Sequence, residues 1–181
     1  MCHVSTDTEI LTYAAFLEEM PKLESPTMDD APRLWEIARD SGVLDVNTPY
    51  SYALWCRDFA QTSVVARGAD GDVSGFITGY VRPDDPGTLF VWQVAVDADS
   101  RGRGLAGRML GYLGGQLSDL GCGYLEATVT PDNVPSTKLF EGFARSRGAR
   151  LKRKERFGED VFPDEVEHDP EVLFRIGPVD H

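Results

Sequence analysis

One segment, residues 91–106, joins an apolar, β-branched run to a helical pattern through a basic corner that contains glycine. The apolar run ends at Asp97, and after Gly104 apolar side chains recur with the spacing of one helix face. The segment therefore predicts a buried strand that leads directly into a helix. The first turn of a helix has unpaired N–H groups and a partial positive charge, so we expect an anion such as phosphate to bind there.

The corner between strand and helix has the residue types that a phosphate site needs. Gly102 and Gly104 let a ligand approach the backbone closely, and Arg101 and Arg103 add cationic donors. The spacing differs from a Walker A loop, which requires Gly-Lys-Ser/Thr, and from the glycine pattern of a dinucleotide-binding turn. The alternative interpretation is an ordinary strand-to-helix turn with exposed arginines.

The corner, Arg101-Gly102-Arg103-Gly104-Leu105-Ala106, resembles the Q/R-x-x-G-x-G/A loop of the GNAT acyltransferase superfamily. The resemblance implies that this loop holds the pyrophosphate of acetyl-CoA. It also implies that the pantetheine arm lies along Val94, Ala95 and Val96, pairing with the backbone, and that an amide near Val94 polarises the thioester. Asn133 matches the position that contacts the CoA arm in this superfamily, and it is equally suited to cap the next helix.

Composition limits the class of protein. The 181 residues suit one domain, and 41% hydrophobic with 27% charged residues is typical of a soluble globular chain. We find no apolar run near the ~20 residues that span a bilayer and no basic signal region, which favours a cytoplasmic protein without membrane partners. The net charge of −12 opposes nucleic-acid binding and suits a cationic substrate, although it also serves solubility. The three cysteines are expected to be free thiols.

The order of the local patterns predicts the architecture. Residues 1–24 are expected to form an N-terminal extension and residues 25–177 a single GNAT domain. The patterns predict helices over 28–40, 49–60, 105–120 and 133–146, and strands over 61–67, 73–81, 89–97, 124–129, 150–157 and 171–176. An α/β (α+β) fold with a mixed, mostly antiparallel central sheet and helices on both faces accommodates this order, and the GNAT resemblance implies the same fold.

Four segments narrow the resemblance to one branch of the superfamily. They are 45–52 (DVNTPYSY), 90–97 (FVWQVAVD), 128–133 (TVTPDN) and 171–176 (EVLFRI). Together they resemble the diaminobutyrate acetyltransferases of ectoine synthesis. This resemblance implies acetyl-CoA as the acetyl donor, the N4 amine of L-2,4-diaminobutyrate as the acceptor, and a homodimer. An acetyltransferase for another small amine, such as a polyamine or amino acid, and an acyl-CoA-binding module without turnover stay open as alternatives.

A diamino acid carries two ammonium groups and one carboxylate, and matching side chains occur in these segments. The substrate-binding candidates are Asp45, Asn47, Tyr50, Tyr52, Trp92 and Thr130. Asp45 would hold an ammonium group, the tyrosines would supply hydroxyls, and Trp92 would bind a cation on its face. Each position has a structural alternative: Asp45 as a turn former, Trp92 as core, and Thr130 as a plain strand-end residue.

An acidic segment near the C-terminus supplies the catalytic candidates. Glu165 or Glu167 would accept the proton of the amine or orient the α-ammonium, and His168 would act as a base. The alternative is a solvated, charged loop. A single histidine among scattered carboxylates has no metal-ligand spacing, so we expect no metal.

One position departs from the superfamily pattern. Many GNAT members carry a tyrosine seven residues after the asparagine of the CoA site, where it protonates the leaving thiolate, and this chain has Phe140. The thiolate must then take its proton from another group, from water or from the product ammonium.

Overall fold

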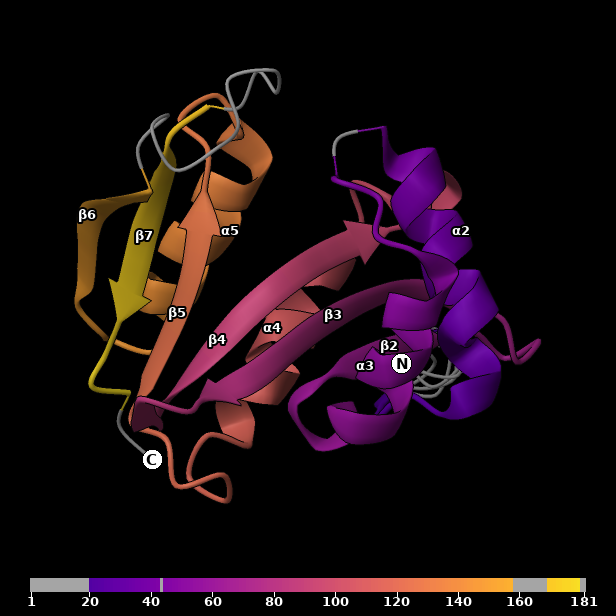
Figure 1. Cartoon of the computed structure of the whole chain (residues 1–181), viewed down its shortest axis with the longest axis horizontal. Helices are drawn as coiled ribbons and strands as arrows, with labels where there is room; N and C mark the ends of the chain where they lie inside the picture. The colour runs from indigo at the N-terminus through magenta and orange to yellow at the C-terminus, as the bar shows by residue number, and fades with distance from the viewer. Residues whose placement is uncertain (1–19, 43, 158–168, 180–181) are drawn as a thin grey trace, which may run out of the picture.

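A mixed sheet of seven strands forms the centre of the computed structural model, which describes residues 20–42, 44–157 and 169–179 (Figure 1). The strands run in the order β1-β2-β3-β4-β5-β7-β6. Only the β4–β5 pair is parallel among these neighbours, as the predicted mixed and mostly antiparallel sheet requires. The bounds are β1 (Lys22–Glu24), β2 (Val64–Arg67), β3 (Val73–Arg82), β4 (Asp85–Val96), β5 (Tyr124–Val129), β6 (Leu151–Phe157) and β7 (Glu171–Ile176).

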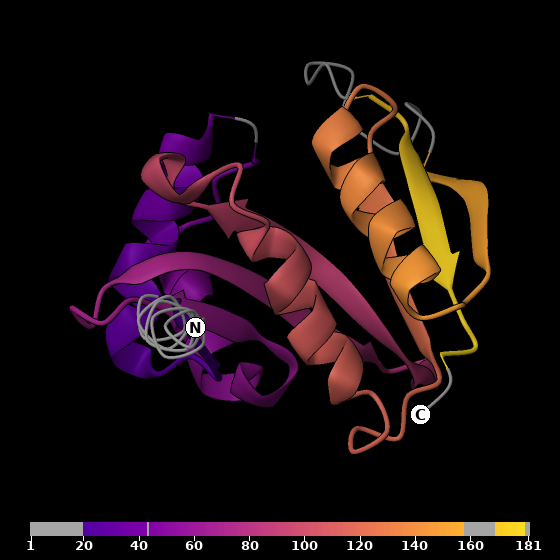
Figure 2. The same ribbon diagram turned by 180° about the vertical axis from the view of Figure 1, so that it is seen from behind.

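Helices cover both faces of the sheet, which confirms the predicted fold class (Figures 1 and 2). On one face lie α2 (Ala31–Ser41) and α3 (Pro49–Asp58), whose buried Leu34 and Tyr52 pack with Phe76 of β3. On the other face lie α4 (Leu105–Gly115) and α5 (Val134–Ser146), whose Leu110 and Phe143 share a core with Leu89 of β4. Among the helices of the described ranges we find none with the length and apolar character needed to cross a membrane.

Several elements differ from the sequence prediction. β4 begins at Asp85 instead of residue 89, and the helix expected from residue 28 starts with a 3-10 turn over Met28–Asp30. β1 is a three-residue edge strand whose pairing with β2 is supported by the Arg67–Glu24 ion pair at 2.6 Å. The strand expected from residue 61 begins at residue 64, after a 3-10 turn over Ala60–Thr62. The helix predicted to reach residue 120 ends at Gly115, and at Gly114 an added Cβ would lie 2.5 Å from the Phe143 ring.

β4 contains a β-bulge next to the point where the sheet opens. Thr78 of β3 pairs with Gln93 and the next residue, Gly79, pairs with Val91, so Trp92 is the extra residue. The bulge reverses the alternation of side chains, so that Val91 joins the α4 core whereas Ala95 joins the core under α2. Pairing between β4 and β5 runs from Thr88–Tyr124 to Val91–Ala127, and beyond it the two strands diverge (Figure 1).

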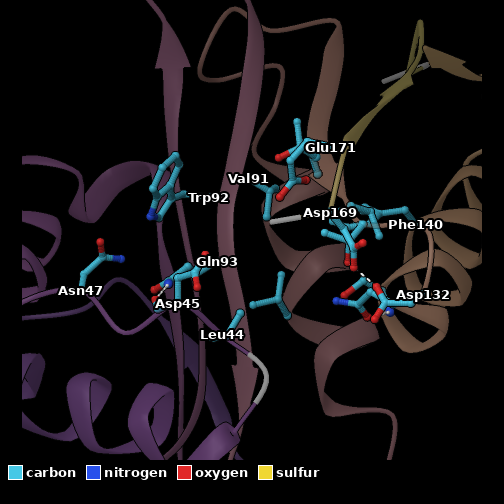
Figure 3. A pocket seen from close by; sticks show the side chains of 17 residues that line it. Leu44, Asp45, Asn47, Val91, Trp92, Gln93, Asp132, Phe140, Asp169 and Glu171 are labelled. Atoms are coloured by element: carbon cyan, nitrogen blue, oxygen red, sulfur yellow. Dashed lines mark hydrogen bonds between the residues drawn. The ribbon is translucent and has the colours of Figure 1, made fainter. Parts of the chain in front are cut away.

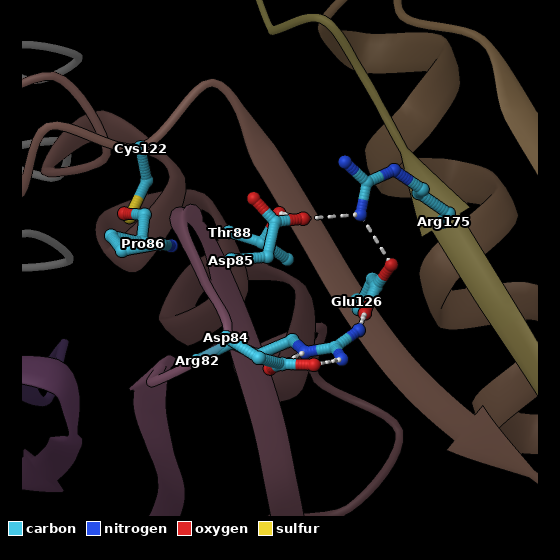
Figure 4. Close-up of polar contacts among 8 residues, drawn as sticks. All are labelled: Arg82, Asp84, Asp85, Pro86, Thr88, Cys122, Glu126 and Arg175. Atoms are coloured by element: carbon cyan, nitrogen blue, oxygen red, sulfur yellow. Dashed lines mark hydrogen bonds and ion pairs between the residues drawn. The ribbon is translucent and has the colours of Figure 1, made fainter.

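We refer to the divergence of β4 and β5 as the split. A cluster of charged side chains lies at its closed end, where the two strands still pair (Figure 4). The Glu126 carboxylate of β5 is buried, and it accepts hydrogen bonds from Arg82 of β3 at 2.7 Å and Arg175 of β7 at 2.5 Å. Arg175 also donates to Asp85 at the start of β4, 3.1 Å away. The Thr88 hydroxyl and this guanidinium lower the pKa of Asp85 below its ordinary value. The cluster therefore ties together four strands where β4 and β5 still pair.

Candidate active site

The divergence of β4 and β5 leaves a cavity of about 470 Å³ (Figure 3). Trp92 and Gln93 of β4, with Asp45 and Asn47 of the α2–α3 loop, form one wall. The facing wall comes from the residues after β5, the first turns of α5 and the start of β7, with labelled side chains Asp132, Phe140, Asp169 and Glu171. We refer to this cavity as the cleft.

The cleft is acidic. Its charged lining residues are Asp45 on one wall and Asp132, Asp169 and Glu171 on the other. None of the described residues that line it is a lysine, an arginine or a histidine. A concave site lined by charges of one sign concentrates ligands of the opposite sign, so the cleft suits a small cationic molecule.

The structure brings together most of the predicted substrate-binding residues. Asp45, Asn47, Trp92 and Thr130 all line the cleft. Trp92 is 49% exposed and stacks on Trp55 at 6.2 Å between ring centroids, so its side chain is not part of the buried core. The Thr130 hydroxyl donates to the Asp132 carboxylate at 2.7 Å.

The two tyrosines of the same segment point in different directions. Tyr50 is 69% exposed and does not line the cleft. Tyr52 is fully buried, and its hydroxyl donates to Gln93 Oε1 at 3.1 Å. Burial raises the pKa of Tyr52, and hydrogen bonds with Asn47 and Gln93 offset part of this rise. Tyr52 is therefore a neutral phenol behind the cleft wall.

Sequence reasoning missed three carboxylates of the cleft: Asp132, Asp169 and Glu171. The signal for Glu171 was its place at the start of the predicted last strand, and for Asp132 its place just after another strand. The predicted catalytic residues Glu165, Glu167 and His168 lie outside the described residues. Asp169, which follows them directly, brings the chain to the cleft wall.

A second cavity, of about 750 Å³, lies between the start of α4 and α5 and contains the predicted phosphate loop. Gly102 and Gly104 adopt left-handed φ angles of 75° and 74°, and a Cβ built on either would have open space around it. Arg101 and Lys138 are the basic residues among the described lining set, which contains no carboxylate. Arg103 is exposed and does not line this cavity.

The amides of this second cavity are arranged for an anion. The first hydrogen bond within α4 joins Arg108 N to Gly104 O at 3.1 Å, so the N–H groups of Leu105 and Ala106 precede it. Both residues line the cavity. Glycines without side chains and unpaired amides at a helix start fit a pyrophosphate, so this loop stays the predicted phosphate site.

The open edge of β4 connects the two cavities. Asp97 N donates to Ser74 O of β3 at 2.9 Å, and peptide groups alternate in direction along a strand. The N–H and C=O groups of Val94 and Val96 therefore point away from β3, towards the split, and Arg101 Nε donates to Val96 O at 3.1 Å. The Ala95 peptide faces β3, and its side chain is buried under α2.

The cap of α5 and two residues within this helix complete the site. The Asn133 side chain lines the cleft and caps the helix, because its Oδ1 accepts from Ser136 N at 3.0 Å. Phe140 is buried and packs on Phe174 with ring centroids 6.2 Å apart. Ser136 lies one helical turn before Phe140 and also lines the cleft, where it carries a hydroxyl that Phe140 lacks.

A sheet that splits between two parallel strands, with a glycine loop at a helix start and an acidic cleft beside the split, is typical of an acyl-CoA-dependent acyltransferase. The model of the acetyltransferase (GNAT) family matches residues 26–143, and the chain belongs to this family. Within the family it groups with the L-2,4-diaminobutyric acid acetyltransferases.

Individual relatives extend along almost the whole chain. The L-2,4-diaminobutyric acid acetyltransferase of Streptomyces avermitilis is 54% identical over 172 residues, which are 93% of this chain and 95% of the relative. That of Streptomyces coelicolor is 55% identical over 159 residues, with 87% and 93% covered. The structure of diaminobutyrate acetyltransferase EctA from Paenibacillus lautus, in complex with its substrate L-2,4-diaminobutyric acid and coenzyme A, aligns with a TM-score of 0.83. It is 39% identical, and 88% of this chain and 96% of that chain are covered.

Proposed function

We propose that the protein transfers the acetyl group of acetyl-CoA to the N4 amine of L-2,4-diaminobutyrate, giving N4-acetyl-L-2,4-diaminobutyrate for ectoine synthesis. One observation carries the proposal: a glycine loop with unpaired helix-start amides and an acidic cleft adjoin the same open edge of β4. The first suits the phosphates of CoA, and the second suits a substrate with two ammonium groups. The named relatives support the same substrate pair.

Acetyl-CoA supplies an acetyl thioester, and the protein provides its binding groups. The amides of Gly102, Gly104, Leu105 and Ala106 would hold the pyrophosphate, with Arg101 and Lys138 as cations near it. The peptide groups of Val94 and Val96 would pair with the pantetheine arm, and Asn133 would contact it. The N–H of Val94 would donate to the thioester oxygen, where negative charge develops during attack by the amine.

The amine must lose a proton before it can attack. With a pKa of ~10.4, about one alkylamine in 2,500 is neutral at pH 7. Carboxylates on both walls would hold the two ammonium groups, Asp45 from one side and Glu171 from the other, with Asn47 and Thr130 beside them. A carboxylate or an imidazole near the reacting nitrogen would accept its proton directly or through water. The candidates are the carboxylates of Glu165, Glu167 and Glu171 and the imidazole of His168.

The departing thiolate also needs a proton. Phe140 has no acidic hydrogen, so the family's usual tyrosine route is closed in this chain. Ser136 is the hydroxyl on the same face of α5, one turn earlier, and it lines the cleft. Water or the product ammonium would serve the same purpose. The proposal also includes the homodimer that the family resemblance implies and the cytoplasmic location that the composition favours.

The identity of the product tests this function. Purified protein incubated with acetyl-CoA and L-2,4-diaminobutyrate should release CoA and give one product, acetylated on N4, as shown by NMR of the isolated compound. Acetylation on the α-amine would place the substrate in the opposite orientation. Binding of CoA without acetylation of any amine would instead indicate an acyl-CoA-binding module.

Trp92 is expected to act on the amine substrate and not on acetyl-CoA. Its half-exposed ring lines the acidic cleft, where it would stabilise an ammonium on its face. We expect Trp92→Ala to raise the KM for diaminobutyrate about tenfold, since such contacts contribute roughly 1–2 kcal/mol, while the KM for acetyl-CoA changes less than twofold. Trp92→Phe keeps a weaker aromatic face, so its KM for diaminobutyrate should lie between the values of the original protein and of Trp92→Ala. Steady-state kinetics decide, and equal increases in both KM values would argue against this assignment.

A further inference from the structure

A buried hydrogen-bond chain links α3 to the cleft wall through β4. The Gln93 side chain is 6% exposed and uses both ends of its amide. Its Oε1 accepts from the Tyr52 hydroxyl at 3.1 Å, and its Nε2 donates to the Asp45 carbonyl at 2.9 Å. Asn47 also hydrogen-bonds with the Tyr52 hydroxyl. Figure 3 shows Gln93 directly beside Asp45 at the base of the wall.

The segment that this chain reaches, residues 44–48, has neither helical nor strand structure. It nevertheless supplies Asp45, Asn47 and Leu44 to the cleft. Leu44 packs on the core under α2, and its N–H donates to Ser41 Oγ at 3.2 Å. The backbone at Asp45 is held differently: its carbonyl accepts a hydrogen bond from the buried side chain of Gln93, which neighbours Trp92 in β4.

We infer that Tyr52 and Gln93 form a positioning pair that fixes residues 44–48, and through them the Asp45 carboxylate, at the distance from Trp92 that the diammonium substrate requires. Neither side chain needs to touch the substrate. This inference rests on the proposed function for the identity of the amine. According to this inference, Tyr52 and Gln93 affect how tightly the protein binds the amine substrate and do not affect how tightly it binds acetyl-CoA.

The chemistry of the pair explains why it holds the loop firmly. A buried phenol or amide without a partner costs more than the hydrogen bond itself contributes, so the folded chain strongly favours the arrangement that satisfies both. Tyr52→Phe deletes only the hydroxyl and retains the edge-to-face packing on Phe76. Gln93→Glu retains shape but places a carboxylate oxygen, which cannot donate, against the Asp45 carbonyl.

The test compares Tyr52→Phe and Gln93→Glu with Thr62→Val, a matched control. Thr62 also has a buried hydroxyl with a short hydrogen bond, to Gly79 O at 2.6 Å, but it does not line the cleft. Both pair variants should raise the KM for diaminobutyrate about tenfold, the effect of one net buried hydrogen bond, with the KM for acetyl-CoA within twofold of the original. Amide hydrogen exchange of residues 44–48 should accelerate in both. Thr62→Val should lower the melting temperature and leave both readouts unchanged.

Two results would overturn the inference. One is unchanged exchange of residues 44–48 in both pair variants. The other is a parallel rise of both KM values, as general destabilisation would produce. If the unmodified protein does not acetylate diaminobutyrate, the proposed function fails, while the exchange measurement still decides whether the pair holds the loop.

Discussion

Gly104→Asp is expected to bind acetyl-CoA more than a hundredfold more weakly than the unmodified protein. Gly104 caps α4 at φ 74°, a backbone conformation that strains any side chain, but a Cβ built there has no atom within 4 Å. Aspartate tolerates this left-handed conformation better than most residues. Its carboxylate would stand at the proposed pyrophosphate position. At ~5 Å and an effective dielectric constant of ~20, each pair of like unit charges costs about 3 kcal/mol. Titration calorimetry with CoA measures the loss.

The matched variant is Gly104→Asn, which has the same shape and no charge. It should weaken CoA binding far less, and both proteins should melt at similar temperatures because asparagine also accepts the left-handed region. If the two variants lost CoA affinity equally, the size of the introduced side chain, and not its negative charge, would account for the loss. An unchanged affinity in Gly104→Asp would place the pyrophosphate elsewhere.

Glu126→Ala is expected to have the largest effect on stability. Glu126 is 1% exposed and is the common acceptor of Arg82 and Arg175, so its removal leaves two guanidinium groups without their buried partner (Figure 4). Breaking such a buried pair costs about 3 kcal/mol or more. For a domain of this size, that corresponds to a melting temperature lower by roughly 6–12 °C. Thermal unfolding followed by circular dichroism measures it.

Asp84→Asn provides the control within the same cluster. Asp84 also pairs with Arg82, at 2.7 Å, but its side chain is 71% exposed. Exposed pairs contribute at most about 1 kcal/mol, so this variant should melt within a few degrees of the original protein. Comparable losses in the two variants would contradict the view that the buried Glu126 carboxylate holds the closed end of the split.

The strand–loop–helix unit at 91–106 was predictable because its signals are local. An apolar run, two glycines and a helical period lie within one short segment, and the left-handed φ angles of Gly102 and Gly104 agree with it. The fold class followed from the order of such units. The bulge at Trp92 was not predictable, because it appears only in the pairing of β4 with β3. The split between β4 and β5 was not predictable either, because it depends on where the pairing of these two strands ends.

The cleft residues likewise include some that local sequence signals predict and others that depend on contacts between distant segments. Asp45 and Trp92 were found because a charge and an aromatic ring suited a diamine, whereas Asp132 and Glu171 reach the cleft only through the pairing of β5 with β7. The sequence predicts that Tyr50 and Tyr52 both supply hydroxyls to the substrate. They lie in α3, where two positions differ by about 200° around the helix axis, so one faces solvent and the other is buried against Gln93.

We propose that the acidic cleft is shaped for one diamino acid. The most direct measurement compares kcat/KM for L-2,4-diaminobutyrate, L-ornithine, L-lysine and spermidine, with CoA release as the readout. We predict that diaminobutyrate exceeds ornithine, which has one more methylene, by at least tenfold, the usual discrimination for one methylene in a fitted pocket. Lysine and spermidine should react more slowly still. Equal or higher values for any of these amines would contradict the substrate assignment and leave the family assignment intact.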